Sequence, residues 1–131
     1  MNLENFLRGY ITAALWSSTD NADDTGGEPL DANYGPDDIE HETLDRMRED
    51  CTDFIASNAE DLAKYAELYT RGREYGIEDC AGHDFWLTRN GHGVGFWDRG
   101  LGALGDRLAD AARVYREFDL YVTDADTIAD I

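Results

Sequence analysis

The spacing of apolar residues changes along this chain, and this change constrains the fold more than any other feature. From Leu3 to Leu15 the apolar side chains recur every three or four residues, the period of an amphipathic helix. Between residues 83 and 98, two aromatic-rich runs instead flank the dipeptide Asn90-Gly91. An Asn-Gly pair between such runs is typical of a β-hairpin turn. The sequence therefore predicts a chain that contains both helices and strands.

Four helices and up to four short strands are expected. The helices span residues 3 to about 16–18, about 37 or 42 to 57, 59 to about 72–76, and about 105 to 118, and the strands are those of the hairpin, 120–122 and 127–129. This pattern predicts an α+β fold, with about four helices packed on a small, mostly antiparallel sheet of three or four strands. The length of 131 residues suits a single domain over 1–131. Residues 17–36 are rich in turn formers and are expected to form a long acidic loop.

Acidic residues are concentrated in one part of the chain. The whole sequence has 29 Asp and Glu against 11 Lys and Arg, a formal net charge of −18. Residues 17–61 hold 15 of these acids and only two bases, which places −13 within 45 residues. Such a charge excludes ordinary binding to phosphate backbones or anionic membranes and favours cationic partners. Adaptation to a salt-rich host is the alternative, although it is expected to spread acids evenly along the sequence.

The helix expected near residues 42–57 carries a row of carboxylates. At about 100° per residue, Glu42, Asp45, Glu49 and Asp53 share the face opposite the apolar side chains. Carboxylates about 5–6 Å apart along a helix can present a field like that of nucleic-acid phosphates. Arg46 lies in the same stripe and is expected to pair with Glu42, Glu49 or Asp50, which weakens this mimicry.

Tryptophans of the expected hairpin are the other candidates for partner binding. Neighbouring residues of a strand point to opposite faces, so only half of the aromatic side chains can enter one core. The rest would mark an interface if they were exposed. The complete set of candidate partner-binding residues is Asp20, Asp23, Asp24, Asp37, Asp38, Glu42, Asp45, Glu49, Asp53, Trp86 and Trp97.

No catalytic motif is present, and the chain is not expected to be an enzyme or to use a metal or cofactor. The run Gly100–Gly105 matches the glycine spacing of a dinucleotide site, but the expected hairpin before it and the negative charge argue against that use. Cys80, His83 and His92, with Asp84 or Asp98 as a fourth ligand, suggest a metal site, yet their spacing matches no zinc template. The more economical interpretation makes Cys80 part of the core and His92 a turn residue.

Targeting signals are also missing from the sequence. The first residues lack a basic segment followed by an apolar run, and no stretch reaches about 18 apolar residues. Only two cysteines are present, which is no disulfide framework. We therefore expect a cytoplasmic protein with reduced thiols.

The run from His83 to Gly100, HDFWLTRNGHGVGFWDRG, resembles a segment of small proteins encoded by bacteriophages and related mobile elements. The likeness continues less closely through residues 101–122 and at Leu15–Ser18. This resemblance implies a phage accessory protein, such as an anti-CRISPR or other anti-defence protein, that acts in the cytoplasm of a bacterial host. It assigns a catalytic role to no residue.

Acidity and resemblance together predict an inhibitor of a host nucleic-acid-binding defence complex, of the anti-CRISPR or anti-restriction type. The acidic segment would occupy a basic DNA- or RNA-binding surface. The expected partner is a basic host protein or nucleoprotein complex, with no direct nucleic-acid or membrane binding, and the protein itself is expected to be a monomer or small homo-oligomer. The alternative is a protein-interaction module that uses the aromatic hairpin 83–99, with the acidity serving only solubility or salt adaptation.

Overall fold

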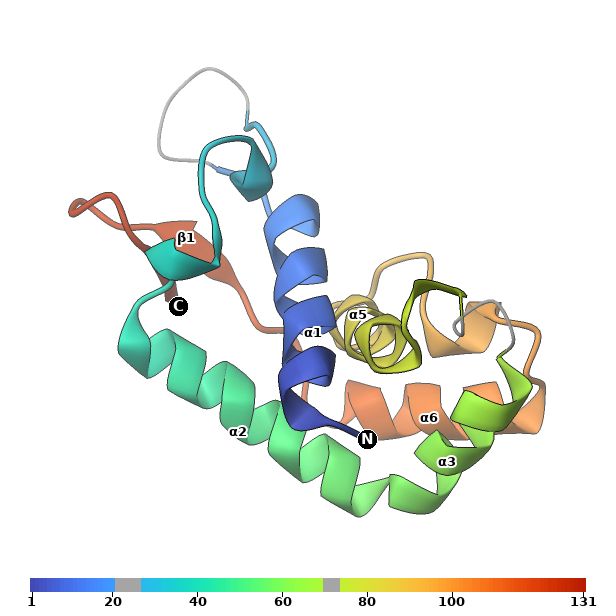
Figure 1. Ribbon diagram of the computed structural model, residues 1–131. Coiled ribbons are helices and arrows are strands. Elements are labelled where there is room, and N and C mark those ends of the chain that lie inside the picture. Colours follow the sequence, from blue (N-terminus) through green and yellow to red (C-terminus); the bar gives the residue numbers. More distant parts are fainter. Residues whose placement is uncertain (21–26, 70–73) are drawn as a thin grey trace.

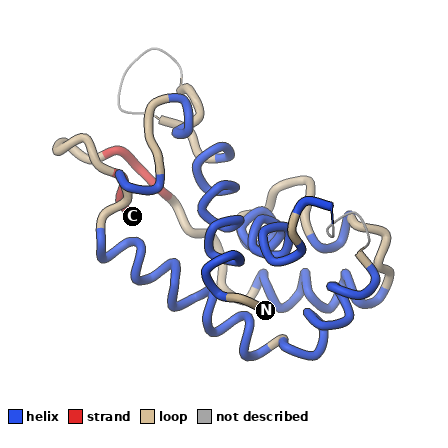
Figure 2. The backbone as a smooth tube through the Cα atoms, viewed as in Figure 1, coloured by secondary structure: helices blue, strands red, loops and turns tan. Residues whose placement is uncertain are grey.

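A computed structural model describes residues 1–20, 27–69 and 74–131 of the protein, and over these residues the chain is mostly helical (Figure 1). Its helices are α1 (Leu3–Ser17), α2 (His41–Ser57), α3 (Ala59–Leu68), α5 (Ile77–Arg89) and α6 (Ala103–Arg113). Three short 3-10 turns lie between them, η1 (Leu30–Ala32), η2 (Pro36–Asp38) and η3 (Phe96–Asp98). Strands β1 (Leu120–Val122) and β2 (Ile128–Asp130) form an antiparallel hairpin, the only sheet in the described ranges (Figure 2).

Helices α1 and α5 lie side by side at the centre of the molecule (Figure 1). The side chain of Asn2 caps α1 by accepting a hydrogen bond of 3.0 Å from the backbone of Asn5. Glycines let the two helices approach closely. A Cβ built on Gly9 would lie only 1.9 Å from the carbonyl oxygen of Asp79. A side chain at this position would therefore force the helices apart.

Aromatic side chains fill the space between α1, α2 and α5. The rings of Phe54 and Phe85 stack with centroids 4.2 Å apart, and Phe6 lies 6.1 Å from each of them. Trp86 meets Tyr10 edge-on at 5.1 Å. These contacts place the aromatic run after His83 in the centre of the core, where large rings exclude the most water.

The C-terminal hairpin packs against the start of α2, away from α3 and α6 (Figure 1). Tyr121 pairs with Ala129 at the middle of the hairpin. The backbone of Glu40 donates a 2.8 Å hydrogen bond to the carbonyl of Ile128, so the segment before α2 lies along β2. The predicted strand at 120–122 is confirmed, and the last strand begins one residue later than expected.

The predicted β-hairpin over residues 83–99 is wrong. Residues 83–89 are the second half of α5, and Gly91 has a φ of 72° just beyond its end. The backbone of His92 donates to the carbonyl of Leu87, and that of Gly91 donates to Thr88. This is the Schellman arrangement that ends a helix at a glycine. Within the described residues the helices therefore pack on each other instead of on a sheet of three or four strands. None of these helices is long and apolar enough to cross a bilayer.

Candidate functional site

The acidic row predicted on α2 lies on an exposed face of that helix. Glu42, Asp45, Glu49 and Asp53 are all exposed. The opposite face is fixed by Met47, Cys51 and Phe54, whose side chains are fully buried. The row therefore stands on a rigid element of the fold, at intervals of about 5–6 Å. We call these four residues the α2 acidic face.

Both arginines of α2 form ion pairs with other elements. Although hydrogen bonds to these partners raise their pKa values most, the charges of Glu42 and Asp45 still contribute to the raised pKa of Arg46, and that of Asp45 to the raised pKa of Arg48. Arg46 donates to the two carboxylate oxygens of Asp130 on β2, and Arg48 pairs with Glu4 on α1. The expectation that Arg46 pairs with Glu42, Glu49 or Asp50 is therefore wrong. Glu42, Asp45 and Glu49 form no ion pair with any residue in the described part of the chain. The arginines thus anchor the helix to its neighbours and leave the α2 acidic face charged.

Most cationic side chains elsewhere in the described residues also form ion pairs with carboxylates of the fold. The residues that the structure describes include nine Lys and Arg and 27 Asp and Glu. Eight of these nine cations form ion pairs with carboxylates. The outward field is therefore dominated by the acids that remain.

The remaining predicted acids lie near the N-terminal end of α2. Asp37 is exposed in η2, whereas the carboxylate of Asp38 accepts a 2.8 Å hydrogen bond from the backbone of Gly35. Asp20 is half-buried, and its charge and that of Asp38 both contribute to raising the pKa of the Tyr34 hydroxyl. A hydrogen bond to Asp126 is the main reason that the pKa of Tyr34 is raised to about 12. The predicted sites Asp23 and Asp24 lie outside the described residues.

The two tryptophans predicted to bind a partner lie in different environments. Trp86 is only 2% exposed and donates a 2.8 Å hydrogen bond to the hydroxyl of Ser17, so its ring is not available on the surface. Trp97, in η3, is 45% exposed. A third tryptophan, Trp16 at the end of α1, is 43% exposed and was not predicted as a surface residue. The tryptophans available to a partner are thus Trp16 and Trp97.

A buried ion pair holds the loop after η3 against α5. The Asp84 side chain is 1% exposed and lies 2.6 Å from Nη2 of Arg99. The hydroxyl of Tyr65 donates a 2.8 Å hydrogen bond to the other oxygen of Asp84. Burial, followed by the charge of Asp84, raises the pKa of Tyr65, while hydrogen bonding to Asp84 raises the pKa of Arg99. The tyrosine therefore stays a donor and the arginine stays charged.

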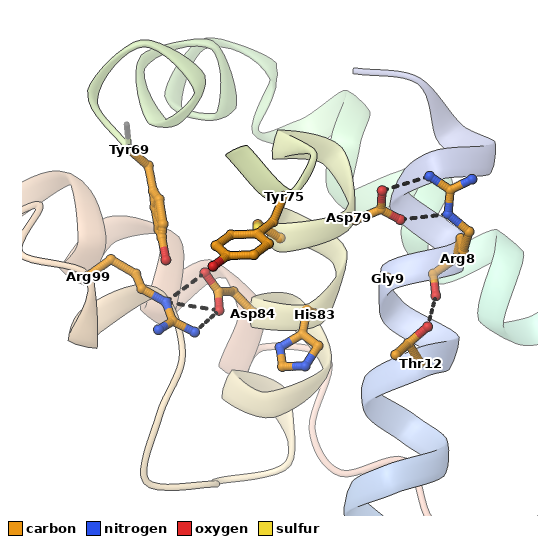
Figure 3. A pocket seen from close by; sticks show the side chains of 10 residues that line it. Arg8, Gly9, Thr12, Tyr69, Tyr75, Asp79, His83, Asp84 and Arg99 are labelled. Atoms are coloured by element: carbon orange, nitrogen blue, oxygen red, sulfur yellow. Dashed lines mark hydrogen bonds and ion pairs between the residues drawn. The ribbon is translucent and has the colours of Figure 1, made fainter. Parts of the chain in front are cut away.

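Beside this ion pair lies a pocket of about 510 Å³ between α1 and α5 (Figure 3). Arg8, Gly9 and Thr12 line it from α1, Asp79, Cys80, His83 and Asp84 from α5, and Tyr69, Tyr75 and Arg99 from neighbouring segments. In the view of Figure 3, the ring of Tyr75 lies between the pairs Arg8–Asp79 and Arg99–Asp84. We call this cavity the α1–α5 pocket.

His83 is the histidine among the residues that line the pocket. Its Nε2 accepts a 3.0 Å hydrogen bond from the indole of Trp16, and the two rings lie 5.8 Å apart. Burial lowers the pKa of His83, and Arg99 lowers it further against the opposite effect of Asp84. The imidazole is therefore neutral near pH 7, with its proton on Nδ1.

The residues of the metal and dinucleotide patterns considered from the sequence can be located in the fold. Burial raises the pKa of Cys80, which makes its thiol a poor ligand at neutral pH. No group of three His, Cys, Asp or Glu side chains among the described residues is arranged to hold a metal. Gly102 precedes α6 with a φ of 59°, and a Cβ on Gly105 would lie 2.7 Å from the carbonyl oxygen of Phe96. These glycines serve the entry and close packing of α6.

The pocket residues were largely missed from the sequence. One signal could have indicated the ion pair beside the pocket, namely the charged residue Asp84 next to the large apolar side chains of residues 85–87. A charge in such a position requires a partner brought from elsewhere in the chain. The identity of that partner depends on the fold, because Tyr65 and Arg99 are separated from Asp84 by 19 and 15 residues.

No protein-family model, curated protein or solved structure matches this chain.

Proposed function

We propose that the protein is an acidic inhibitor, of the phage anti-defence type, that occupies the basic nucleic-acid-binding surface of a host CRISPR or restriction complex inside the bacterial cytoplasm. The observation that carries this proposal is the α2 acidic face. Four exposed carboxylates stand in a row on one helix while both arginines of that helix pair with other elements. A basic groove that binds phosphates offers the complementary charge.

Rigidity supports this use of the helix. The opposite side of α2 is buried, and its start is tied to the C-terminal hairpin through Asp130, which accepts hydrogen bonds from Thr43 and Arg46. Pre-organised charges lose little conformational entropy when a partner binds. Asp53 also accepts a hydrogen bond from the hydroxyl of Tyr115, whereas Glu42, Asp45 and Glu49 form no ion pair within the described residues. Neighbouring like charges repel each other, so the concentration of carboxylates on one face is consistent with selection for binding.

The proposal is tested by neutralising the α2 acidic face. The variant Glu42→Gln, Asp45→Asn, Glu49→Gln and Asp53→Asn removes four charges without changing buried residues. The measurement is DNA binding and cleavage by purified CRISPR effector complexes and restriction enzymes, with increasing amounts of the protein. We expect wild type to inhibit at least one of them, to lose potency steeply as salt increases, and the variant to lose inhibition.

A matched control separates this face from the overall charge. Glu74→Gln, Asp98→Asn, Glu117→Gln and Asp119→Asn also removes four exposed charges, all outside α2. This control should inhibit as well as wild type. Equal inhibition by both variants would contradict the proposal. Loss of inhibition in Trp97→Ala alone would instead favour an interaction module built on the exposed aromatic side chain.

A further inference from the structure

The α1–α5 pocket has the size and walls of a small-molecule site. Its volume of about 510 Å³ lies within the range of about 300–1,000 Å³ typical of such sites. Gly9, one of its lining residues, lies where the backbones of α1 and α5 are in close contact. The pocket lies on α1 and α5, whereas the α2 acidic face lies on another helix. A ligand in this pocket would thus be a function separate from the proposed inhibition.

Charges in the pocket are compensated within the fold. Arg8 pairs with Asp79 at 2.7 Å, and Arg99 pairs with Asp84 at 2.6 Å. His83 is neutral near pH 7 because burial lowers its pKa, and its Nε2 accepts the hydrogen bond from Trp16. An anionic ligand would meet two carboxylates here, on a protein whose net charge is −18. The pocket is therefore suited to an uncharged ligand.

Hydrogen-bond donors remain after these pairs have formed. Arg8 and Arg99 each bond to their carboxylates through Nε and Nη2, which leaves Nη1 outside the pair. The Nδ1 proton of His83 is likewise not used in the bond to Trp16. A ligand with ring nitrogens or carbonyl oxygens can accept from such donors without bringing a charge.

An exposed aromatic ring supplies a stacking surface at the same place. Tyr75 lines the pocket although it is 65% exposed, and among the described residues it makes no ring contact or hydrogen bond. Tyr69, also in the wall, lies under the guanidinium of Arg99 at 5.8 Å. Planar rings stack favourably on such side chains.

We propose that the α1–α5 pocket binds an uncharged heteroaromatic small molecule of the nucleobase or nucleoside class. The ring stacks on Tyr75, and its acceptors face His83 and Arg99. The buried Asp84–Arg99 pair is consistent with this assignment, since a buried ion pair is weak evidence for stability and perturbed ionisable groups in a cleft cluster at functional sites.

The proposal is tested by titrating adenosine, guanosine, cytidine and uridine into the 15N-labelled protein and following backbone amide shifts. At least one nucleoside should shift the amides of pocket residues on α1 and α5 and leave those of α2 unchanged. It should bind more tightly than its own monophosphate. Tyr75→Ala should weaken binding about tenfold, because stacking on one aromatic ring accounts for a factor of this order.

Two further variants serve as a control for the tyrosine substitution and as a block of the pocket. Tyr121→Ala removes another exposed tyrosine, on β1, and should bind like wild type. Thr12→Trp places bulk in the pocket from an exposed position of α1 and should abolish binding. The proposal is overturned if no nucleoside shifts the pocket amides, if the monophosphate or a single-stranded oligonucleotide binds more tightly than the nucleoside, or if Tyr75→Ala and Tyr121→Ala behave alike.

Discussion

Gly82 of α5 lies against the backbone of Phe6 on α1 so closely that a Cβ at Gly82 would be 1.9 Å from the Phe6 carbonyl oxygen. The neighbouring groups are backbone atoms of a helix, which cannot turn aside as a flexible side chain can. Gly9 makes the reciprocal approach to Asp79 on α5. The two central helices therefore cross through a pair of glycines, and the aromatic core is built around that crossing.

The variant Gly82→Ala should lower the free energy of unfolding by about 3 kcal/mol, because α1 and α5 must separate to admit the methyl group. Urea denaturation measures this change. Gly35→Ala is the matched control, since Gly35 has an ordinary φ of −128° and nothing within 4 Å of its added Cβ. It should change stability by less than about 0.5 kcal/mol. A similar loss in both variants would mean that the crossing is not the cause.

The buried ion pair gives a second prediction. Asp84→Asn leaves the guanidinium of Arg99 without its charge partner and should cost about 3 kcal/mol or more in unfolding free energy. Tyr65→Phe removes only the hydrogen bond to Asp84 and should cost about 1–2 kcal/mol. Urea denaturation of both variants tests the order of these effects. If Tyr65→Phe were the more destabilising of the two, the ion pair would not be the main interaction of this cluster.

Stability should depend on pH through His83. Burial holds its pKa below the ordinary value of 6.5, so the unfolded chain binds a proton more strongly than the folded protein does. The stability contributed by neutral His83 is therefore complete above about pH 6.5 and is lost as the pH falls from there toward the folded-state pKa. Protonation also removes the Nε2 acceptor used by Trp16.

This dependence is measured by urea unfolding at about pH 7.5 and about pH 5.5, on either side of the unfolded-state pKa. Wild type should lose stability at the lower pH, and His83→Gln should lose less. His41 and His92 are present in both proteins, so they cancel from the comparison. An equal loss in the two proteins would assign the effect to other groups.

The helices with one apolar face could be predicted from the sequence, whereas the centrally buried helix α5 could not. Helix α1 was predicted to begin after Asn2 and does so. Its apolar residues follow a clear helical period because one face is buried and the other is in water. In α5, by contrast, every residue from Asp84 to Arg89 is buried. A helix covered on all sides has no polar face, so its period is hidden. The aromatic residues then favoured a strand on propensity alone.

The dipeptide Asn90-Gly91 shows why the error arose. An Asn-Gly pair suits a hairpin turn, yet a glycine with positive φ also ends helices. The choice between these depends on whether the preceding residues are helical, and here they form α5, which packs closely on α1 at Gly82. The exposed acids on α2 could be predicted, because that helix has a clear apolar side. The pocket could not, because its walls come from distant segments.

The buried guanidinium of Arg89 forms hydrogen bonds to several elements of the fold, so substitution of Arg89 tests how much these bonds stabilise the protein. Its side chain is 3% exposed, and Nη1 lies 2.7 Å from the carboxylate of Asp50. Nε and Nη2 donate to the carbonyls of Arg116 and Tyr115, each at 2.8 Å. A third element is held as well, since Nη1 also donates to the hydroxyl of Tyr10 at 3.1 Å. One guanidinium thus joins α5 to α1, to α2 and to the segment after α6.

Arg89→Lys should therefore destabilise the protein by about 3 kcal/mol or more, although it keeps the charge. A lysine ammonium has no planar fork, so it cannot reach the two carbonyls and Asp50 together, and buried acceptors are left unpaired. Arg113→Lys is the matched control, because Arg113 is 53% exposed and pairs only with nearby Asp110 among the described residues. That variant should lie within about 0.5 kcal/mol of wild type in urea denaturation. Equal stability of the two lysine variants would show that charge alone, and not the geometry of the guanidinium, holds these helices together.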